Sequence, residues 1–567
     1  MLILSIIVGL AAGISAAILK NAVHLIQSSL ELIHIEYHTL FYLIYPSIGV
    51  LFVILFIKYI VKLPIRHGIP NVLYSVSQNK GYIKPHNMYS SIVASAITVG
   101  FGGSVGLEGP AVSTGAAIGS TIGKSLRLTN KQVTLLLGCA SAGAMSAIFK
   151  APIAAIVFSM EILMLDLTLA SLGPILLASA SAVIMSYLIM GQEVVIPIDL
   201  AHGFIMEEVP YYILLGIVAG LTSIYWKRSY LYISDLFSKI ENSYKKLLIG
   251  GFSLGLIILI FPPLYGEGYS SMNNGLEGSF DYLFDNSFFE SFKGNSIVII
   301  TLLIAMILLK VVAASITFGS GGVGGIFAPT LFTGVNLGLL FAFVVNHFGF
   351  LDLPGSNFAL IGMGGMIAGV LHGPLTAIFL IGDLTGGYEL VVPLLISATF
   401  SYSTVRIFTT NSVYTHQLAA RKQLITHHKD KAALAFLDIN TLMETNFSVI
   451  QAGGKLGDLI NVVKTSSRNI FPVIDEENNF LGVVTMDDIR EIMFRPELYD
   501  KIKITELMYM PENNVEINEY MEEIVKKFRT SNDYTLAVTE KGKYKGFVSR
   551  ANIFSAYRKI IQEYSDH

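Results

Sequence analysis

A glycine-rich motif occurs twice in this chain, each time inside an apolar stretch. Residues 98–110 read TVGFGGSVGLEGP and residues 317–329 read TFGSGGVGGIFAP, with six of thirteen positions identical at an offset of 219. A second pair follows, because residues 143–162 resemble residues 365–384 at an offset of 222. The apolar part of the chain is therefore an internal duplication. Repeats with Gly/Pro-interrupted apolar segments at matching positions are typical of transporter folds, whose binding site lies at the repeat interface near the middle of the bilayer.

The composition changes near residue 420. Residues 1–420 hold 37 charged side chains and residues 421–567 hold 42, so the density of charge roughly triples there. Because 53% of all residues are hydrophobic, we interpret the first part as an integral membrane domain and the last part as a separate soluble one. Residues 311–351 carry no Lys, Arg, Asp or Glu but have five glycines between positions 319 and 325. This stretch predicts two apolar elements joined by a glycine turn. The backbone N–H and C=O groups of that turn must be hydrogen-bonded by other parts of the protein or by water in a cavity.

The soluble part alternates short strands with amphipathic helices. Strand, strand and helix occur twice in that order, at 469–475, 480–485 and 486–494, and again at 534–539, 545–549 and 550–564. This pattern predicts a tandem of two α/β units. We therefore divide the chain into a membrane domain at 1–420, a linker at 421–437, and two soluble units at 438–500 and 501–567.

Glu108 is the only charged residue between Lys84 and Lys124, and it stands in GLEGP, where the glycine loop should turn into a helix. An ionisable side chain in a hydrocarbon-spanning region is costly unless it faces a cavity or a partner, so Glu108 is a functional candidate. As an anion at a helix start it competes with a permeating anion until it is protonated, which would make it a proton-sensitive gate. The alternative is an acid that only caps its own helix.

Four turns marked by glycine or proline could place helix starts inside the membrane. They are RHGIP at 66–70, GLEGP at 106–110, GIFAP at 325–329 and, more weakly, the region before Tyr414. Each helix start carries about half a positive charge and several free N–H donors, so converging starts form an anion site without a full cation. Such a site can release its ion quickly, as conduction requires.

These motifs resemble those of the CLC chloride channels and chloride/proton antiporters. GLEGP is similar to the family's G(K/R)EGP with its gating glutamate, GIFAP to its GxFxP and HGIP to its GSGIP, in the family's order. The resemblance implies an all-α polytopic membrane domain built as an inverted repeat, and a homodimer with one chloride pathway in each subunit, in the plasma or inner membrane. It makes Glu108 the gate. It also implies an anion pathway formed by His67, Gly68, Ile69, Ile326, Phe327 and Tyr414. The alternative for Phe327 and Tyr414 is that they are ordinary core aromatics.

His67 departs from the family pattern, because a serine usually contributes its hydroxyl to the anion at this position. A neutral imidazole can donate one hydrogen bond and a protonated one adds charge, so anion selectivity or the response to pH could shift. The alternative is that His67 points away and the backbone amides of Gly68 and Ile69 suffice.

Ile162 is a second departure, because antiporters of the family usually carry an inner proton-transfer glutamate there. Isoleucine cannot carry a proton. The preceding Glu161 is expected to make a structural hydrogen bond, as Asp383 would in the second repeat. Since some antiporters also lack the inner acid, Ile162 favours channel-like passage only by a narrow margin over chloride/proton antiport along another proton route.

The C-terminal tandem resembles a pair of cytoplasmic CBS domains. In such domains a strand ending Gly-x-x-Ser/Thr-x-x-Asp offers a hydroxyl to phosphate and a carboxylate to ribose. Residues 482–488 read GVVTMDD, so Thr485 and Asp488 are predicted contacts of an adenine nucleotide. Residues 546–552 read GFVSRAN, which leaves Ser549 and Asn552 open as a second half-site. The alternative is a purely structural or dimerising pair, and no cofactor is required for transport.

Two other classes of protein fit less well. A CBS-regulated divalent-cation transporter needs clustered membrane carboxylates, whereas the acids of this membrane domain are few and scattered. An intramembrane hydrolase needs a nucleophile and a base at reactive spacing, and no such motif is visible, so no enzyme is expected. The histidines lack ligand spacing and no basic block occurs, so we expect neither a metal site nor a nucleic-acid partner. The expected partners are chloride, membrane lipid and, in the antiporter reading, protons.

Overall fold

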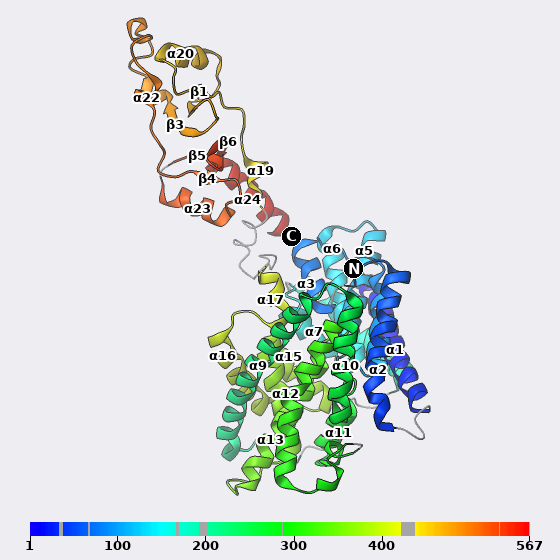
Figure 1. Cartoon of the computed structure of the whole chain (residues 1–567). Helices are drawn as coiled ribbons and strands as arrows, with labels where there is room; N and C mark the ends of the chain where they lie inside the picture. Colours follow the sequence, from blue (N-terminus) through cyan, green and yellow to red (C-terminus); the bar gives the residue numbers. More distant parts are fainter. Residues whose placement is uncertain are drawn as a thin grey trace. The chain divides into compact units, whose positions relative to one another are not determined.

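The computed structural model describes residues 1–32, 38–65, 68–165, 169–191, 201–285, 287–420, 437–531 and 533–565. The chain divides into two compact units, residues 1–424 and 425–567. The first is helical and the second contains all the strands (Figure 1).

Unit 1 is built from helices of very different lengths. Its α-helices are α1 (Leu2–Leu32), α2 (His38–Leu55), α3 (Gly68–Gln78), α4 (Asn87–Gly100), α5 (Glu108–Ser125), α6 (Asn130–Phe149), α7 (Pro152–Glu161), α8 (Leu169–Met190), α9 (Val209–Ser238), α10 (Ser243–Ile260), α11 (Tyr269–Leu276), α12 (Ser296–Ser320), α13 (Phe327–His347), α14 (Gly355–Leu371), α15 (Pro374–Thr385), α16 (Val391–Phe408) and α17 (Val413–Ala420). Short turns of 3₁₀ or π-helix are η1 (Phe56–Val61), η2 (Met206–Glu208), η3 (Pro262–Leu264), η4 (Asp281–Leu283) and η5 (Glu290–Phe292).

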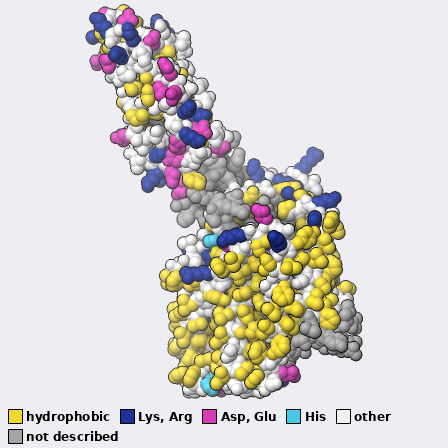
Figure 2. All heavy atoms as spheres, viewed as in Figure 1, with side chains coloured by type: hydrophobic (Ala, Val, Ile, Leu, Met, Phe, Trp, Pro, Cys, Tyr) yellow, Lys and Arg dark blue, Asp and Glu magenta, His cyan; other side chains and the backbone are white. Residues whose placement is uncertain are grey.

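Unit 1 has the composition of a membrane domain. Within the described ranges, nine helices are long and apolar enough to cross a membrane. Hydrophobic side chains cover a broad band of the face drawn in Figure 2, and Lys and Arg gather along one end of that band. The prediction of an all-α polytopic membrane domain is thus confirmed.

The glycine turns separate helices as the sequence predicts. α12 ends at Ser320 and α13 begins at Phe327, so the uncharged stretch does contain two elements. Gly321 closes α12 with a φ of 116°, in the left-handed region that suits glycine. In the first repeat, α4 ends and α5 begins around the equivalent turn.

Glycines also let the two long site helices pack closely on their neighbours. A Cβ added to Gly115 of α5 would lie 2.4 Å from the Ala140 carbonyl oxygen of α6. A Cβ added to Gly334 of α13 would lie 2.5 Å from the Met363 Cα of α14. Gly115 and Gly334 differ by the repeat offset of 219, so both repeats use the same close contact, as membrane helices often do. These contacts fix the directions of α5 and α13, which carry the site.

Unit 2 contains two three-stranded sheets of the same topology. The first is β1 (Ile450–Gln451), β2 (Ile470–Ile474) and β3 (Phe480–Thr485), and the second is β4 (Val515–Glu516), β5 (Thr535–Glu540) and β6 (Lys543–Ser549). In each sheet the first strand is parallel to the second and the second is antiparallel to the third. The helices are α19 (Ile439–Leu442), α20 (Leu456–Thr465), α21 (Met486–Ile489), α22 (Ile504–Leu507), α23 (Met521–Thr530) and α24 (Arg550–Ser565), and η6 spans Pro496–Leu498.

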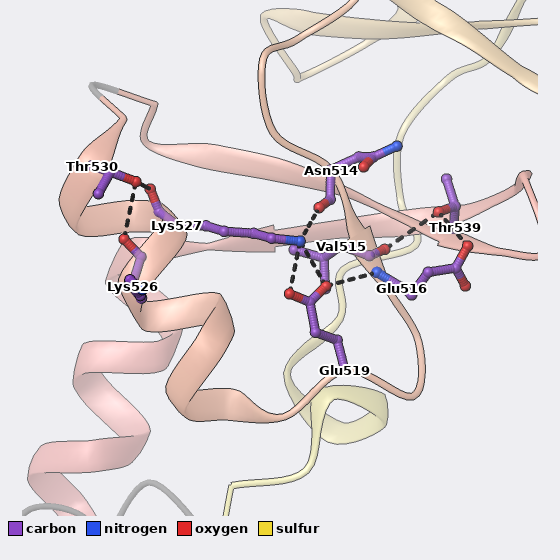
Figure 3. Close-up of polar contacts among 8 residues, drawn as sticks. All are labelled: Asn514, Val515, Glu516, Glu519, Lys526, Lys527, Thr530 and Thr539. Atoms are coloured by element: carbon purple, nitrogen blue, oxygen red, sulfur yellow. Dashed lines mark hydrogen bonds and ion pairs between the residues drawn. The ribbon is translucent and has the colours of Figure 1, made fainter.

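One lysine anchors a helix of the second sheet. Lys527 Nζ of α23 donates to Glu519 Oε2 at 2.8 Å and to the Asn514 carbonyl at 2.7 Å, next to β4 (Figure 3). Thr539 of β5 donates to the Glu516 carboxylate at 3.3 Å. These contacts join α23, β4 and β5 at one edge of the sheet.

Candidate functional site

The two glycine loops of the duplication meet inside unit 1. The Gly106 N–H donates to the Gly325 carbonyl at 2.8 Å, and the Gly325 N–H donates to the Gly106 carbonyl at 2.7 Å. A Cβ added to Gly106 would lie 2.1 Å from Glu108 Oε2. A Cβ added to Gly325 would lie 2.8 Å from the Gly109 nitrogen, so neither loop has room for a side chain. Because Gly106 and Gly325 occupy the same position in the two repeats, a pseudo-two-fold axis passes between them.

Two threonines fasten the loops in the same symmetric way. Thr98 Oγ1 accepts a hydrogen bond from the Val323 N–H at 3.0 Å. Thr317 Oγ1 accepts one from the Ser104 N–H at 3.2 Å. The N–H groups of Ser104 and Val323 are therefore each satisfied by the other repeat, as membrane depth requires.

A cavity of about 30 Å³ lies where helices of unit 1 begin, and it has room for one small ion or one or two waters. α3 begins at Gly68, α5 at Glu108, α13 at Phe327 and α17 at Val413. The lining residues are uncharged: Gly68, Ile69, Pro70, Gly109, Tyr230, Phe318, Gly324, Gly325, Ile326, Val413 and Tyr414. Converging helix starts give such a cavity a positive potential and N–H donors.

The structure brings together most of the residues predicted for the anion pathway. Gly68, Ile69, Ile326 and Tyr414 all line this cavity. Phe327 does not line it, because its fully buried ring packs on Phe149 with the ring centroids 5.2 Å apart. His67 lies outside the described residues.

Tyr414 is placed to contact a ligand through its hydroxyl. Its side chain is 5% exposed, and among the described residues its buried Oη has no hydrogen-bond partner. A buried hydroxyl normally has a partner, so an unpaired one beside a cavity can donate to a bound anion.

Two lining aromatics were missed by the sequence analysis. Tyr230 of α9 meets Phe318 of α12 edge to face, with the ring centroids 6.0 Å apart. Phe318 belongs to the repeated motif, so the duplication could have indicated it. Tyr230 lies in a long apolar helix and no motif marks it.

Glu108 is the first residue of α5 and is fully buried. Its Oε1 accepts a hydrogen bond from the Tyr269 hydroxyl at 3.0 Å, whereas the part of the chain that the structure describes offers no hydrogen-bond partner to its Oε2. Gly109 and Gly325 line the cavity, and a Cβ added to Gly325 would lie 3.5 Å from Glu108 Oε2, so the carboxyl group lies beside the lining of the cavity. Tyr269 was not predicted, because it is far from Glu108 in the sequence and outside the repeated motifs.

Glu161 and Asp383 cap each other's helices across the pseudo-two-fold axis. The Glu161 carboxylate accepts from the Leu375 N–H at 3.1 Å and the Thr376 N–H at 2.7 Å, at the start of α15. Asp383 Oδ2 accepts from the Ile153 and Ala154 N–H groups at 2.9 and 3.0 Å, at the start of α7. The predicted structural hydrogen bonds of both acids are thus confirmed.

Ile162 follows directly on Glu161, and its side chain is 4% exposed. A Cβ added to Gly373 would lie 2.7 Å from Ile162 Cδ1. The position of the family's inner acid is therefore filled by a packed apolar side chain beside the start of α15.

In the first predicted nucleotide half-site, the two predicted contact residues are hydrogen-bonded to each other. The Thr485 N–H and hydroxyl both donate to Asp488 Oδ2 at 2.7 Å, and together they form a capping box of α21. Tyr509 pairs with β3 beside this box. Partial burial and the carboxylates of Asp488 and Asp533 raise the pKa of the Tyr509 phenol.

The second half-site already holds a carboxylate of the chain itself. Glu444 Oε1 accepts from Ser549 Oγ at 3.1 Å and from Asn552 Nδ2 at 2.8 Å. Arg468 pairs with Glu444 Oε2 at 2.7 Å. Ser549 and Asn552 therefore donate their hydrogen bonds to Glu444 in this structure. No sequence motif indicated this contact.

Comparisons with known proteins agree with this geometry. The sequence model of the family described as voltage gated chloride channel matches residues 48–406. That of the CBS domain matches residues 438–495. The chain is 29% identical over 401 residues to a ClcB-like chloride channel protein of Ralstonia nicotianae, which covers 67% of this chain and 86% of that protein.

Two further relatives differ in described mode or in extent. The chain is 30% identical over 312 residues to the H(+)/Cl(-) exchange transporter ClcA of Vibrio cholerae, covering 53% of this chain and 62% of that protein. The crystal structure of a eukaryotic CLC transporter shares the fold with a TM-score of 0.63 at 17% identity, covering 97% of this chain and 98% of that one.

Proposed function

Since this chain belongs to the voltage gated chloride channel family, CLC, we propose that its chloride pathway crosses the cavity between the helix starts and is gated by Glu108. The chain is a CLC-type chloride transport protein and not an enzyme. The observation that carries the proposal is the convergence of Gly68, Gly109, Ile326 and Tyr414 on one small cavity beside the buried Glu108 carboxyl group.

The cavity suits an anion that must also leave. Helix-start N–H groups and the unpaired Tyr414 hydroxyl supply donors. The lining residues carry no full positive charge, so binding stays weak enough for transit. The side chain of Phe327 packs elsewhere, so Phe327 would contact the anion only through its backbone N–H at the start of α13.

Glu108 controls occupancy by its charge. The ionised carboxylate is an anion at a helix start and competes with chloride for the same donors. Protonation removes that competition.

We propose channel-like passage, with antiport along another proton route as the alternative. Ile162 is apolar and packed against the start of α15, and both Glu161 oxygens are committed to N–H groups of that helix. Neither residue can easily load a proton for Glu108. Relatives with each mode are similar to this chain.

Flux from purified protein in liposomes tests this proposal. Chloride efflux and external pH are recorded together under an outward chloride gradient. We expect chloride efflux without proton uptake. Chloride efflux that drives protons uphill would establish the antiport alternative, and absence of anion flux would overturn the proposal.

The subunit arrangement and the membrane side also belong to the proposal. Ile153 and Leu375 stand at matching positions of the two repeats and are 44% and 52% exposed, which gives α7 and α15 a symmetric apolar face for a second copy. Molecular mass in detergent would show a dimer or a monomer. Lys and Arg along one end of the apolar band (Figure 2) support a cytoplasmic position for that end, in a plasma or inner membrane.

For unit 2 we propose two CBS domains, at 438–500 and 501–567, after a linker at 421–437. The first half-site, Thr485 and Asp488, is the better one for an adenine nucleotide, because a ribose and phosphate would replace bonds that the pair makes only to itself. In the second half-site a nucleotide would have to displace Glu444 from Ser549 and Asn552.

Removing Asp488 should weaken nucleotide binding selectively. We expect Asp488→Ala to lower the affinity of the full chain for ATP by at least about tenfold, since a carboxylate hydrogen bond to ribose is lost. Isothermal titration in detergent measures this. Asp487→Ala is the matched control, because Asp487 is exposed and forms an exposed ion pair with Arg490. Equal ATP affinity of Asp488→Ala and the natural chain would reject this half-site.

A further inference from the structure

A second carboxyl group reaches the start of α5 beside the gate. Glu267 Oε1 accepts a hydrogen bond from the N–H of Leu107, the residue before Glu108, at 3.1 Å. Two residues later in the same segment, the Tyr269 hydroxyl donates to Glu108 Oε1. The segment GEGY at 266–269 therefore touches the gate twice.

The backbone holds Glu267 in this position. Gly266 and Gly268 flank it with φ angles of 59° and 91°, in the left-handed region. A Cβ added to Gly268 would lie 2.6 Å from the Phe332 ring of α13. Glu267 thus lies in a turn whose two flanking glycines could not be replaced by larger residues without strain.

A buried ammonium group completes the cluster. Lys310 of α12 is fully buried, and its Nζ donates to the Gly266 carbonyl at 3.0 Å and lies 4.7 Å from the centroid of the Phe332 ring. Burial disfavours a charge on Lys310, and the electrostatic interaction with Glu267 partly offsets this effect.

The charged and titratable groups that face Glu267 come from four elements. They are Lys20 of α1, Glu108 of α5, Tyr269 of α11 and Lys310 of α12. Two carboxylates that interact in a low-dielectric site do not both ionise freely, and they take up protons as a coupled pair. Both carboxyl groups lie in a low-dielectric environment, since Glu108 is fully buried and Glu267 is hydrogen-bonded to the backbone of the residue before Glu108.

We propose that Glu267 is a second proton-binding carboxyl group of the transport pathway, which titrates together with Glu108 and sets the pH at which the gate opens. An ionised Glu267 favours the proton on Glu108 by repulsion, and Lys310 opposes it. This inference rests on the proposed gating role of Glu108. It differs from a purely structural role, in which Glu267 only accepts the Leu107 N–H.

The pH profile of chloride efflux from liposomes tests the coupling. Glutamine at position 267 keeps an oxygen acceptor for the Leu107 N–H but carries no charge. We expect Glu267→Gln to move the midpoint of the pH profile to lower pH by about one pH unit, the size expected for one charge several ångströms away in a protein interior. Lys310→Met should move the midpoint in the opposite direction, to higher pH.

The controls separate this inference from the function on which it rests. Glu277→Gln removes an exposed acid at the end of α11 and should reproduce the natural profile. A Glu267→Gln profile that superimposes on the natural one, while Glu108→Gln abolishes the pH dependence, would overturn the inference and leave the gate intact. A Glu108→Gln profile with the natural pH dependence would instead remove the gate itself. Because Glu267→Gln carries the test alone, poor folding of Lys310→Met does not affect it.

Discussion

Glu108→Gln should make chloride flux almost independent of pH, whereas the natural protein is expected to lose flux as pH rises and the Glu108 carboxyl group ionises. Glutamine has nearly the same shape, keeps an oxygen for the Tyr269 hydroxyl, and cannot become an anion. It therefore stands for the protonated gate at every pH. In the natural protein, flux should fall about tenfold for each pH unit above the midpoint, because only the protonated fraction is open.

Chloride efflux from liposomes, measured with a chloride electrode at a series of pH values, gives the two profiles directly. Glu207→Gln is a suitable comparison, because Glu207 is an exposed acid of unit 1 away from the cavity. A steep pH profile in Glu108→Gln would show that another group gates the pathway.

Glu161→Ala should clearly destabilise the membrane domain. It removes the acceptor of two N–H groups and of the Thr376 hydroxyl, which also donates to Glu161 Oε2 at 2.8 Å. Leaving such donors without partners costs about 3 kcal/mol in the free energy of unfolding. Asp383→Ala removes the equivalent cap of α7 and should cost a similar amount.

The single cysteine offers a probe for this measurement. Cys139 is buried, so a thiol-reactive dye reports unfolding when the protein is heated in detergent. We expect a clearly lower unfolding midpoint for each variant and an unchanged midpoint for Glu207→Ala. Because the two caps share no residue, the double variant should lose about the sum of both effects. A midpoint equal to that of the natural chain would mean that water replaces the caps.

Sequence reasoning succeeded where residues belong to a repeated motif. The duplication aligned Gly106 with Gly325 and Glu161 with Asp383, and an internal repeat in a membrane implies a symmetry axis. It also brought Gly68, Ile326 and Tyr414 to one site through helix-start chemistry.

It failed where a contact depends on a single residue distant in sequence. Glu267 and Lys310 reach the start of α5 only through the packing of α11 and α12, and one glutamate or one lysine carries no periodic signal. Phe327 was expected to line the pathway, but its ring packs on Phe149. The direction of the ring depends on side-chain packing, which the motif does not determine. The bond from Glu444 to Ser549 likewise depends on how two separate segments of unit 2 meet.

The exchange of hydrogen bonds between Gly106 and Gly325 also constrains how the chain is made. Synthesis proceeds from the N-terminus, so the first loop exists for 219 residues of elongation before its partner loop appears. During that interval its N–H and C=O groups must find water or another partner, since lipid offers none. The first half of the membrane domain therefore cannot satisfy the hydrogen bonds of its buried loop by itself. The proposed pathway can form only after the second half has been inserted.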